Sequence, residues 1–479
     1  MATVFQLNYR IMNLKIKIQK VLVTFVLSPI FIINGNAQEN IPPQHPIIQT
    51  KYTADPAPMV HNDTVFLYTS HDEDDAMGFK MKDWLLYYST DMVNWTEHGV
   101  VASLDNFDWV PYDNGAWAVQ CVERNGKFYL YCPMPGGVGI GVLVADSPYG
   151  PFKDPLGKPL IRNSNHDIDP TILIDDDGQA YMYWGNPKVY YVKLNEDMIS
   201  FSGEIIQEPT TPENYQEGPW VWKRNGLYYM AYASTCCPEG IGYAMSNSPT
   251  GPWKYKGMIV DASEKTRGNH PGIVEYKGKW YCFGHSYDLL KKITPKFYER
   301  RSVDMDEMVY NPDGTIQNRH YWSVEGPEQV EPLNPFKRVE AETMAWSEGV
   351  KTRSETEWEG NFDWDRGKKI ADRLFVTDIN HGDYIKVKGV DFSDGAESVE
   401  VSVSPIYGGK IEIRADKING PVIATVDVNI TRQAGIWSTF TAPVNDITGI
   451  HDVYFVFKGE KDLFYFDWWQ FYPARESEE

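Results

Sequence analysis

Five residues that can bind or react with a polar ligand occupy one place in a pattern repeated along residues 50–320. Each is followed about eight residues later by a hairpin-type turn and then by an aromatic-rich strand. A repeat of this period built only from strands is typical of a β-propeller, in which equivalent positions of successive blades converge on one axis. The five, with their turns, are Asp55 before Asn62-Asp63, Trp117 before Asn125-Gly126, Asp169 before Asp177-Gly178, Glu217 before Asn225-Gly226 and His270 before Lys277-Gly278.

Three of these converging residues are carboxylic acids, Asp55, Asp169 and Glu217. Two carboxyl groups on opposite sides of a sugar ring suffice to hydrolyse a glycosidic bond, because one protonates the leaving oxygen while the other activates water. A third carboxylate near the acid raises that acid's pKa by like-charge repulsion. A lone Asp-Pro more often begins a turn, but three acids in register with a histidine favour catalysis. Asp167 competes with Asp169 for its place, and only Asp169 has the proline and the turn spacing.

Strands rather than helices must position these side chains. Alternating runs rich in Val, Tyr, Phe and Ile dominate the sequence, and amphipathic helix periodicity is scarce. A proline, which has no N–H donor and is tolerated where a strand begins, stands one or two residues after four of the site residues. Each site residue is therefore predicted at the start of an innermost strand. The segments ADSPYGPF (145–152) and MSNSPTGPW (245–253) repeat one another directly.

The length of 479 residues predicts two domains, because one ordinary core rarely grows so large. Residues 51–335 account for the five blades. From Phe336 onward, residues 336–475 show short strands with regularly spaced turns, which predicts a β-sandwich of the jelly-roll kind. The expected fold class is all-β, a five-bladed β-propeller followed by a β-sandwich.

The N-terminus predicts export. Basic residues Lys15, Lys17 and Lys20 precede an apolar run, so residues 1–37 are interpreted as a cleavable signal peptide and residues 38–50 as a linker. The apolar run is short for a membrane span, and we expect a secreted or periplasmic monomer. The net charge of −21 argues against nucleic acid as a partner.

Cysteine usage gives little sign of a disulfide framework. The five cysteines are odd in number and fit no zinc-binding spacing. Cys121 and Cys132 flank a hairpin turn, so a bridge between them is one interpretation. We favour the other, in which all five are small buried hydrophobic residues.

The acid-bearing segments resemble the three signature segments of glycoside hydrolase family 43. They are ADPAPMV with Asp55, DIDPTILIDDDGQAYMYWG with Asp169 and EGPWVWKRNGLYYMAYAS with Glu217, within a resemblance that covers roughly residues 50–325. The resemblance implies a five-bladed propeller and an inverting mechanism, with Asp55 as general base, Glu217 as general acid and Asp169 as pKa modulator. Inversion implies base and acid carboxyls about 6.5–9.5 Å apart.

The same resemblance suggests residues that bind substrate. His270 matches a histidine on the axis of many members, near or coordinating a central ion. The alternative is a histidine that is only hydrogen-bonded in the channel, and Pro271 stands where arabinoxylan-degrading members often carry a second histidine. Arg301 matches a pocket arginine, with pairing to Asp304 or Asp306 as the alternative.

Tryptophan rings stack on sugars but more often fill cores. Trp117, Trp109 and Trp222 are candidates for a sugar platform, and only Trp117 has the blade register. The acidic segment HDEDDAMGF (71–79) either borders the pocket or, as we favour, is a solvated loop.

The C-terminal domain resembles a family 6 carbohydrate-binding module through segments such as VEAE (339–342), GGKIEIRAD and FDWWQF. The resemblance implies a structural Ca²⁺ held by Glu340, Glu342 and Asp467, whose oxygen donors suit a hard cation. It also implies a sugar-stacking role for Trp437. Tyr465 replaces the asparagine usually found before the DWW-like segment.

The sequence thus predicts an exo-acting inverting glycoside hydrolase that removes terminal pentose from xylose- or arabinose-containing polysaccharide fragments. We favour a β-D-xylosidase, with an α-L-arabinofuranosidase as the alternative. An endo-arabinanase or a non-catalytic propeller lectin are further alternatives.

Overall fold

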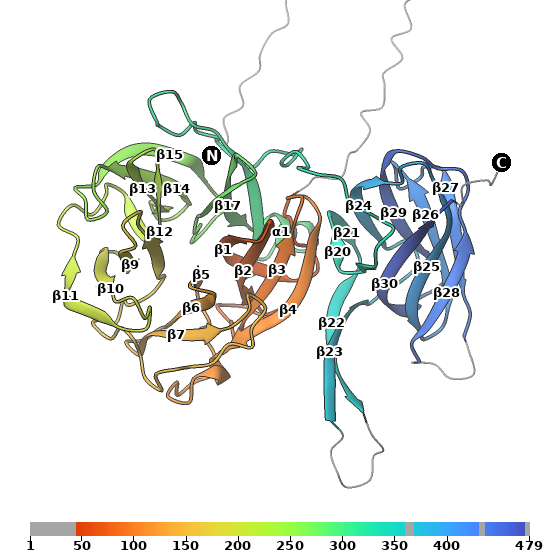
Figure 1. Ribbon diagram of the computed structural model, residues 1–479, viewed down its shortest axis with the longest axis horizontal. Coiled ribbons are helices and arrows are strands. Elements are labelled where there is room, and N and C mark those ends of the chain that lie inside the picture. The colour runs from red at the N-terminus through yellow and green to blue at the C-terminus, as the bar shows by residue number, and fades with distance from the viewer. Residues whose placement is uncertain (1–44, 360–367, 431–435, 475–479) are drawn as a thin grey trace, which may run out of the picture. The chain divides into compact units, whose positions relative to one another are not determined.

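The computed structural model describes residues 45–359, 368–430 and 436–474, and almost all of the regular structure in them is short antiparallel strand (Figure 1). The all-β prediction is confirmed. The predicted signal peptide (1–37) and residues 38–44 of the predicted linker lie outside the described residues. Within the described ranges, no helix combines the length and apolar character needed to cross a bilayer.

Residues 52–308 form five antiparallel sheets, which are the five predicted blades. In chain order the sheets comprise β1 (Tyr52–His61), β2 (Thr64–Asp72), β3 (Asp83–Ser89) and β4 (Trp95–Ser103); β5 (Gln120–Arg124), β6 (Lys127–Met134) and β7 (Gly139–Ala145); β8 (Thr171–Ile174), β9 (Ala180–Trp184), β10 (Tyr190–Leu194) and β11 (Phe201–Gln207); β12 (Tyr215–Arg224), β13 (Leu227–Ser234), β14 (Glu239–Ser246) and β15 (Lys254–Ser263); and β16 (Gly272–Tyr276), β17 (Lys279–Ser286) and β18 (Ser302–Met308). Two short helices, η1 (Leu104–Asn106) and α1 (Asp288–Ile293), lie in connections.

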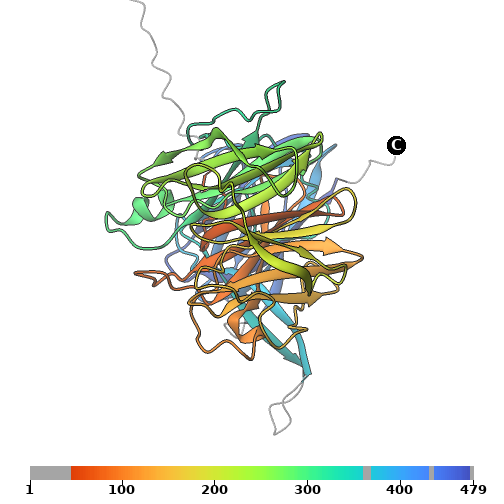
Figure 2. The ribbon, with the colours of Figure 1, turned by 90° about the vertical axis from the view of Figure 1, so that its left-hand side faces the viewer.

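The innermost strands β1, β5, β8, β12 and β16 form a closed ring. Each contacts the innermost strand of the next blade, and β16 contacts β1 (Figures 1 and 2). Turn chemistry shapes the blades locally. Asn125 and Gly126 have φ values of +54° and +73°, and Asn225 and Gly226 have +50° and +75°, as a tight turn between twisted strands requires. The predicted Asn-Gly hairpins are therefore present.

Buried tyrosines join neighbouring blades. The Tyr68 hydroxyl donates a hydrogen bond to the Pro148 carbonyl (2.7 Å), and Tyr183 donates to the Pro249 carbonyl (2.6 Å). Both prolines belong to the repeated segments 145–152 and 245–253, so the sequence repeat reflects one repeated inter-blade contact. Tyr276 donates to the Asp63 carbonyl (2.7 Å) and so joins the fifth blade to the first. A buried tyrosine hydroxyl needs such a partner.

The C-terminal residues form the two facing sheets of the predicted sandwich. One consists of β22 (Lys351–Glu359), β23 (Lys368–Thr377), β30 (Phe464–Pro473), β25 (Ala396–Pro405) and β28 (Ser438–Pro443), with β19 (Val339–Glu340) on β30; the other of β21 (Trp346–Glu348), β24 (Tyr384–Asp391), β29 (Ile450–Lys458), β26 (Gly409–Ala415) and β27 (Val422–Val428). A separate strand, β20 (Thr343–Met344), pairs with β4.

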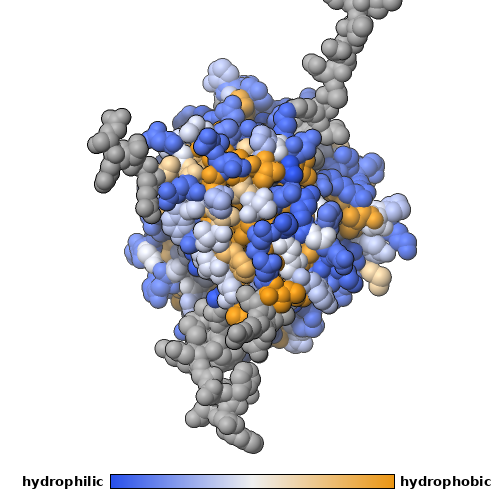
Figure 3. Space-filling model, turned by 90° about the vertical axis from the view of Figure 1, so that its right-hand side faces the viewer, coloured by the Kyte–Doolittle hydropathy of each residue, from blue (hydrophilic) through white to orange (hydrophobic). Residues whose placement is uncertain are grey.

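Alternating side chains fill the core between these two sheets. Val399, Val401 and Val403 on one sheet, and Phe455 and Phe457 on the other, are fully buried. Hydrophilic residues cover most of the face of the molecule drawn in Figure 3, with apolar groups between them. The sandwich therefore has its own apolar interior, as expected of strands that alternate between core and solvent.

Candidate active site

One cavity of about 230 Å³ brings the five repeat residues together. Asp55 lies in β1 and Glu217 in β12, whereas Trp117, Asp169 and His270 stand just before β5, β8 and β16. All five line this cavity. The five repeat residues therefore converge on one cavity, as the repeat predicts.

Asp55 is held as a carboxylate. Its backbone is left-handed (φ +52°) at a register shift of β1, a conformation that costs about 1–3 kcal/mol and concentrates at functional sites. Ser70 Oγ donates to Oδ2 (2.7 Å) and Arg301 Nη1 donates to Oδ1 (3.1 Å). Burial raises the pKa of Asp55, but the charges of Arg301 and His270 and the Ser70 hydrogen bond bring it below its ordinary value. The side chain is therefore suited to accept a proton.

Asp169 has the same left-handed backbone conformation as Asp55, but its pKa is raised where that of Asp55 is lowered. Its φ is +59°, and the Gly218 N–H donates to its Oδ2 (3.2 Å). Burial, together with the nearby charges of Glu217 and Asp55, raises the pKa of Asp169 to about 7 against the effect of His270. The carboxyl group thus keeps a proton close to neutral pH.

The competing acid Asp167 has a structural role. Its carboxylate accepts hydrogen bonds from the Ser164 N–H (2.7 Å) and from Trp184 Nε1 (2.9 Å). It fixes the loop that precedes β8 and does not line the cavity. The choice of Asp169 over Asp167 agrees with this placement.

Glu217 is the most accessible of the three acids, with a side chain 20% exposed. Asn186 Nδ2 donates to its Oε2, and His270 Nε2 lies 3.5 Å from Oε1. Burial raises the pKa of Glu217, but the hydrogen bond and charge of His270 bring it below its ordinary value. The upward shift expected for Glu217 falls on Asp169 instead, because His270 is hydrogen-bonded to Glu217 and acts on Asp169 only through its charge.

His270 lies among the three acids. Nδ1 is 3.4 Å from Asp55 Oδ1, and Nε2 is 3.5 Å from Glu217 Oε1 and 3.8 Å from Asp169 Oδ2. Burial lowers the pKa of His270, but the three carboxylates outweigh it and raise the pKa to about 10. A Cβ at Gly218, where φ is +60°, would lie 2.8 Å from the imidazole ring. Only glycine allows the ring this position.

The central ion considered from the sequence stays a prediction. Ligand atoms of Asp169, Glu217 and His270 lie within 4.8 Å of one another. The carboxylates raise the pKa of His270, so a protonated imidazole balances their charge where no ion is bound.

Arg301 is positioned by an acid that sequence reasoning missed. Its Nε and Nη2 donate to the two oxygens of Asp72 (both 2.9 Å), while Nη1 reaches Asp55. The alternative pairing of Arg301 with Asp304 or Asp306 is wrong. Asp72 belongs to the acidic segment 71–79, whose composition gave no sign of a buried partner.

The same segment also contributes to the wall of the cavity. Phe79 lines it, as does Met81 just beyond the segment, and the Arg301 guanidinium lies 5.3 Å from the Phe79 ring centroid. The segment 71–79 is therefore not simply a solvated loop. Trp117, half-buried, lines the cavity beside Phe79, with ring centroids 6.4 Å apart.

The other two tryptophans belong to the protein interior. Trp109 Nε1 donates to Asp154 (2.8 Å), and Trp222 stacks on Tyr229 with ring centroids 5.1 Å apart. Neither lines the cavity. Blade register thus separated the one pocket tryptophan from the two that pack.

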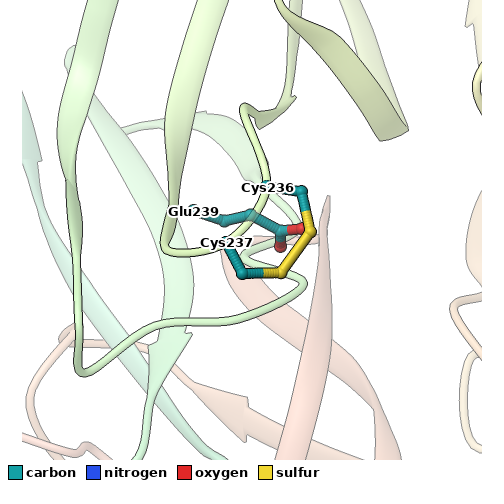
Figure 4. A group of neighbouring side chains, drawn as sticks. All are labelled: Cys236, Cys237 and Glu239. Carbon is teal, nitrogen blue, oxygen red and sulfur yellow. A yellow bond between two sulfur atoms is a disulfide. The ribbon is translucent and has the colours of Figure 1, made fainter.

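Two cysteines contradict the expectation that all five are buried and free. Cys236 and Cys237, adjacent in the loop between β13 and β14, form a disulfide, and both are exposed (Figure 4). The other three cysteines are buried thiols, as expected. The disulfide and the neighbouring Glu239 line the cavity. The only sequence signal was the pair of adjacent cysteines in a turn that follows the strand beside Glu217.

A sequence model of glycosyl hydrolases family 43 matches residues 43–316, more than half of the chain. The chain belongs to glycosyl hydrolases family 43. A model of carbohydrate binding module family 6 matches residues 340–473. Both predicted resemblances are confirmed.

Proteins similar to this family 43 chain have related names. "Arabinoxylan arabinofuranohydrolase" of Bacillus subtilis (strain 168) is 32% identical over 89% of this chain and 92% of its own length. The crystal structure of a family 43 arabinoxylan arabinofuranohydrolase from Bacillus subtilis in complex with cellotetraose superposes with a TM-score of 0.77 at 31% identity, covering 91% of this chain and 98% of that one. The crystal structure of a family 43 β-xylosidase/α-arabinofuranosidase from a compost microbial metagenome, in complex with xylotriose and in a calcium-free form, has a TM-score of 0.52 at 30% identity. The match covers 57% of this chain and 96% of that one.

In the family 6 module, the three predicted calcium ligands come from neighbouring segments, but their oxygens are not among the groups of ligand atoms within 4.8 Å of one another in the described part of the chain. In the β19–β30 pairing, Glu340 lies opposite Trp468, the residue next to Asp467. Arg338 Nη2 lies 2.8 Å from Glu340 Oε2, and Arg373 Nη1 lies 3.3 Å from Asp467 Oδ2. Glu342 is buried, and its Oε2 has no hydrogen-bond partner within the described ranges. Burial and the charge of Glu340 raise the pKa of Glu342 well above its ordinary value. An orphaned buried oxygen among acids fits a hard cation.

Trp437 of the family 6 module is half-buried. Its ring packs edge-on against Phe375 (5.3 Å between centroids), and the Arg373 guanidinium lies 4.7 Å from its centroid. Tyr465 packs on the same Phe375 ring, at 4.9 Å. The predicted sugar-stacking role of Trp437 stays a prediction.

Proposed function

We propose that this family 43 protein is an exo-acting, inverting glycoside hydrolase that releases single pentose units from arabinose- and xylose-containing polysaccharide fragments. The observation that carries the proposal is the convergence of Asp55, Asp169 and Glu217 on one small cavity. Its volume of about 230 Å³ is below the roughly 300–1,000 Å³ of drug-sized pockets. A cavity of that size favours a terminal sugar over a long stretch of polymer.

The α-L-arabinofuranosyl unit is the first candidate for the released sugar. Two similar proteins that extend over both domains of this chain are named arabinoxylan arabinofuranohydrolase, whereas a third, 25% identical over 85% of the chain, is named xylosidase/arabinosidase. The β-D-xylosyl unit, which the sequence analysis favoured, is the second candidate. It is supported by the β-xylosidase/α-arabinofuranosidase that matches the propeller alone.

In the proposed reaction, the Asp55 carboxylate takes a proton from a water molecule whose oxygen attacks the anomeric carbon. The bond to the leaving oxygen breaks, and that oxygen receives the proton of Glu217. The charges of His270 and Arg301 keep Asp55 ionised. Asp169, with a pKa of about 7 and within 4.8 Å of Glu217, holds a proton that the pair can share.

Release of a coloured aglycone from aryl α-L-arabinofuranoside and aryl β-D-xyloside tests the proposal. We expect turnover of at least one, with the arabinofuranoside faster. Activity on neither, with activity on a linear polymer, would refute the exo assignment. Proton NMR of the first sugar released should show the inverted anomer, and retention would refute the roles given to Asp55 and Glu217.

We also propose that the protein is exported and that its family 6 module holds a structural Ca²⁺. Export is supported by the disulfide between two exposed cysteines, because such bonds persist in oxidising compartments. N-terminal sequencing of the mature protein should begin near residue 38, and a cytoplasmic protein that retains residues 1–37 would contradict export. The calcium proposal is supported by the unpaired, buried oxygen of Glu342.

A further inference from the structure

The loop between β13 and β14 places an unusual pair of groups on the cavity wall. The Cys236–Cys237 disulfide and the Glu239 carboxyl both line the cavity, and their sulfur and oxygen atoms lie within 4.8 Å of one another (Figure 4). The proposed reaction uses neither group. A carboxyl group buried in a substrate cavity without a catalytic duty, beside a disulfide exposed to the same cavity, requires another explanation.

This wall adjoins the acid rather than the base. In the β12–β13 pairing Glu217 lies opposite Ala233, so the chain passes directly from the strand beside Glu217 into the loop that carries the disulfide. Gly268 lies beside both carboxyls, since a Cβ built on it would lie 3.6 Å from Glu217 Oε1 and 3.9 Å from both Glu239 Oε2 and Arg301 Nη1. Asp55 belongs to a different blade. Because Glu217 protonates the leaving oxygen in the proposed reaction, the groups next to it face the leaving group.

The two groups have complementary chemistry for a sugar ring. A disulfide between adjacent residues offers polarizable sulfur and no N–H or O–H donor, and its closed ring is already rigid before a ligand binds. Such a surface suits the C–H face of a sugar. The Glu239 carboxyl is oriented by the Asn269 N–H, which donates to Oε2 (3.2 Å), and it can hydrogen-bond a sugar hydroxyl. Burial and the charge of Glu217 raise the pKa of Glu239 to about 7.

We propose that the Cys236–Cys237 disulfide and Glu239 form the binding surface for the sugar unit on the leaving-group side of the cleaved bond. They thereby make the enzyme prefer oligosaccharides over glycosides with small synthetic leaving groups. This inference rests on the proposed function, because it takes Glu217 as the acid. The disulfide provides the apolar contact and Glu239 the polar one.

Reduction of the disulfide tests the inference on the intact protein. Tris(2-carboxyethyl)phosphine gives two electrons to the disulfide and takes the oxygen of one water molecule to become the phosphine oxide, while the two protons of that water convert the two sulfurs to thiols. We measure kcat/KM for an arabinoxylan oligosaccharide and for an aryl glycoside of the same pentose, before and after reduction. The ratio of the two values should fall about tenfold, through a higher KM for the oligosaccharide, as when an apolar contact to a substrate is lost.

The double variant C236S/C237S is the matched control. It should show the lowered ratio from the start and no further response to the phosphine, because the only disulfide within the described ranges is gone. Glu239→Gln keeps the size of the side chain but removes its charge, and it should lower the same ratio roughly two- to tenfold, the effect of one weakened hydrogen bond.

The outcomes separate this inference from the function on which it rests. An unchanged ratio after reduction, or an equal loss on both substrates, would overturn the inference while leaving the hydrolase assignment intact. A response of C236S/C237S to the phosphine equal to that of the wild type would overturn it too. Failure of the oxidised protein to cleave either substrate would overturn the proposed function, and with it the inference.

Discussion

Two clusters of three acids in this protein have different counter-charges. The propeller acids are Asp55, Asp169 and Glu217, and the sandwich acids are Glu340, Glu342 and Asp467. The propeller acids surround a histidine whose pKa is raised to about 10, and they line a cavity. The sandwich acids are paired with Arg338 and Arg373, and one of them keeps an unpaired buried oxygen.

The counter-charge distinguishes a site that moves protons from one that only balances charge. Arginine does not release its proton in proteins, so the side chains paired with Glu340 and Asp467 neutralise charge without exchanging protons. Histidine and a buried carboxyl with a pKa of about 7 both exchange protons. The backbone differs as well, because Asp55 and Asp169 have positive φ values. Strain of this kind is retained where the surrounding structure and function require it.

The largest expected effects come from removing the propeller acids. Asp55→Asn should lower kcat about 10³–10⁴-fold on every substrate, because no other group takes the proton from water. Glu217→Gln should cause a comparable loss on oligosaccharides but much less on activated aryl glycosides, whose leaving groups need no acid. Steady-state kinetics on the two substrate types measures both effects.

The sandwich variant Asp467→Asn is the control for this pair of substitutions. It removes an acid from the other cluster and should leave kcat unchanged on both substrates. An equal loss for Glu217→Gln on good and poor leaving groups would contradict its role as the acid. A loss of kcat in Asp467→Asn would contradict the contrast between the clusters.

A smaller effect is expected at Gly218, which allows His270 its central position. The Cβ of Gly218→Ala would lie 2.8 Å from the imidazole ring, so the ring must move away from the acids. We expect kcat/KM to fall about 10²-fold, as for misplacement of a catalytic group by 1 Å. Gly226→Ala is the matched control, because its φ of +75° is equally unsuited to alanine but its Cβ would meet nothing within 4 Å. It should lose stability and keep kcat.

The repeat explains why the floor of the site was predictable from sequence and its walls were not. Asp55, Asp169 and Glu217 share one position in three of the five blades, and ring closure makes that position converge. Asp72 and Glu239 lie outside this register, and their contacts join different strands and loops, so no local pattern marks them. The electrostatics of His270 also depend on three chain segments at once.

Proton transfer among the propeller acids predicts a dependence on pH. The pKa of Asp169 is raised to about 7, so the proton that it shares with Glu217 is lost as the pH rises through that value. Above it, kcat/KM should fall about tenfold per pH unit. The pKa of Asp55 is lowered, so the acid limb should appear only below the ordinary range for aspartate.

A pH–rate profile on an aryl glycoside measures these two limbs. Asp169→Asn should move the alkaline limb away from neutral pH and lower the plateau. An alkaline limb that stays near pH 7 in this variant would contradict the assignment of the proton to Asp169. Glu342→Gln, a change in the sandwich acids, should leave the profile as it is.

The smallest expected effect is on thermal stability, and it tests calcium binding by the sandwich acids alone. Calcium at 100 times its Kd contributes about 2.7 kcal/mol, which corresponds to a Tm increase of about 5–10 °C for a domain of this size. Differential scanning calorimetry with Ca²⁺ and with a chelator measures the shift. A chelator that lowers the rate on an aryl glycoside as well would indicate an ion among Asp169, Glu217 and His270, whose ligand atoms lie within 4.8 Å of one another.

The effect of calcium on the stability of the family 6 module should also depend on pH and on Glu342. Burial and the charge of Glu340 raise the pKa of Glu342 in the folded protein. Its contribution to stability is therefore present at acidic pH and lost as the pH rises through the folded-state value. Without calcium, Glu342→Gln removes this loss and should stabilise the module near neutral pH. With calcium the order should reverse, because the wild type gains a ligand for the ion and the variant does not. A variant that responds to Ca²⁺ as strongly as the wild type would show that Glu342 is not a ligand.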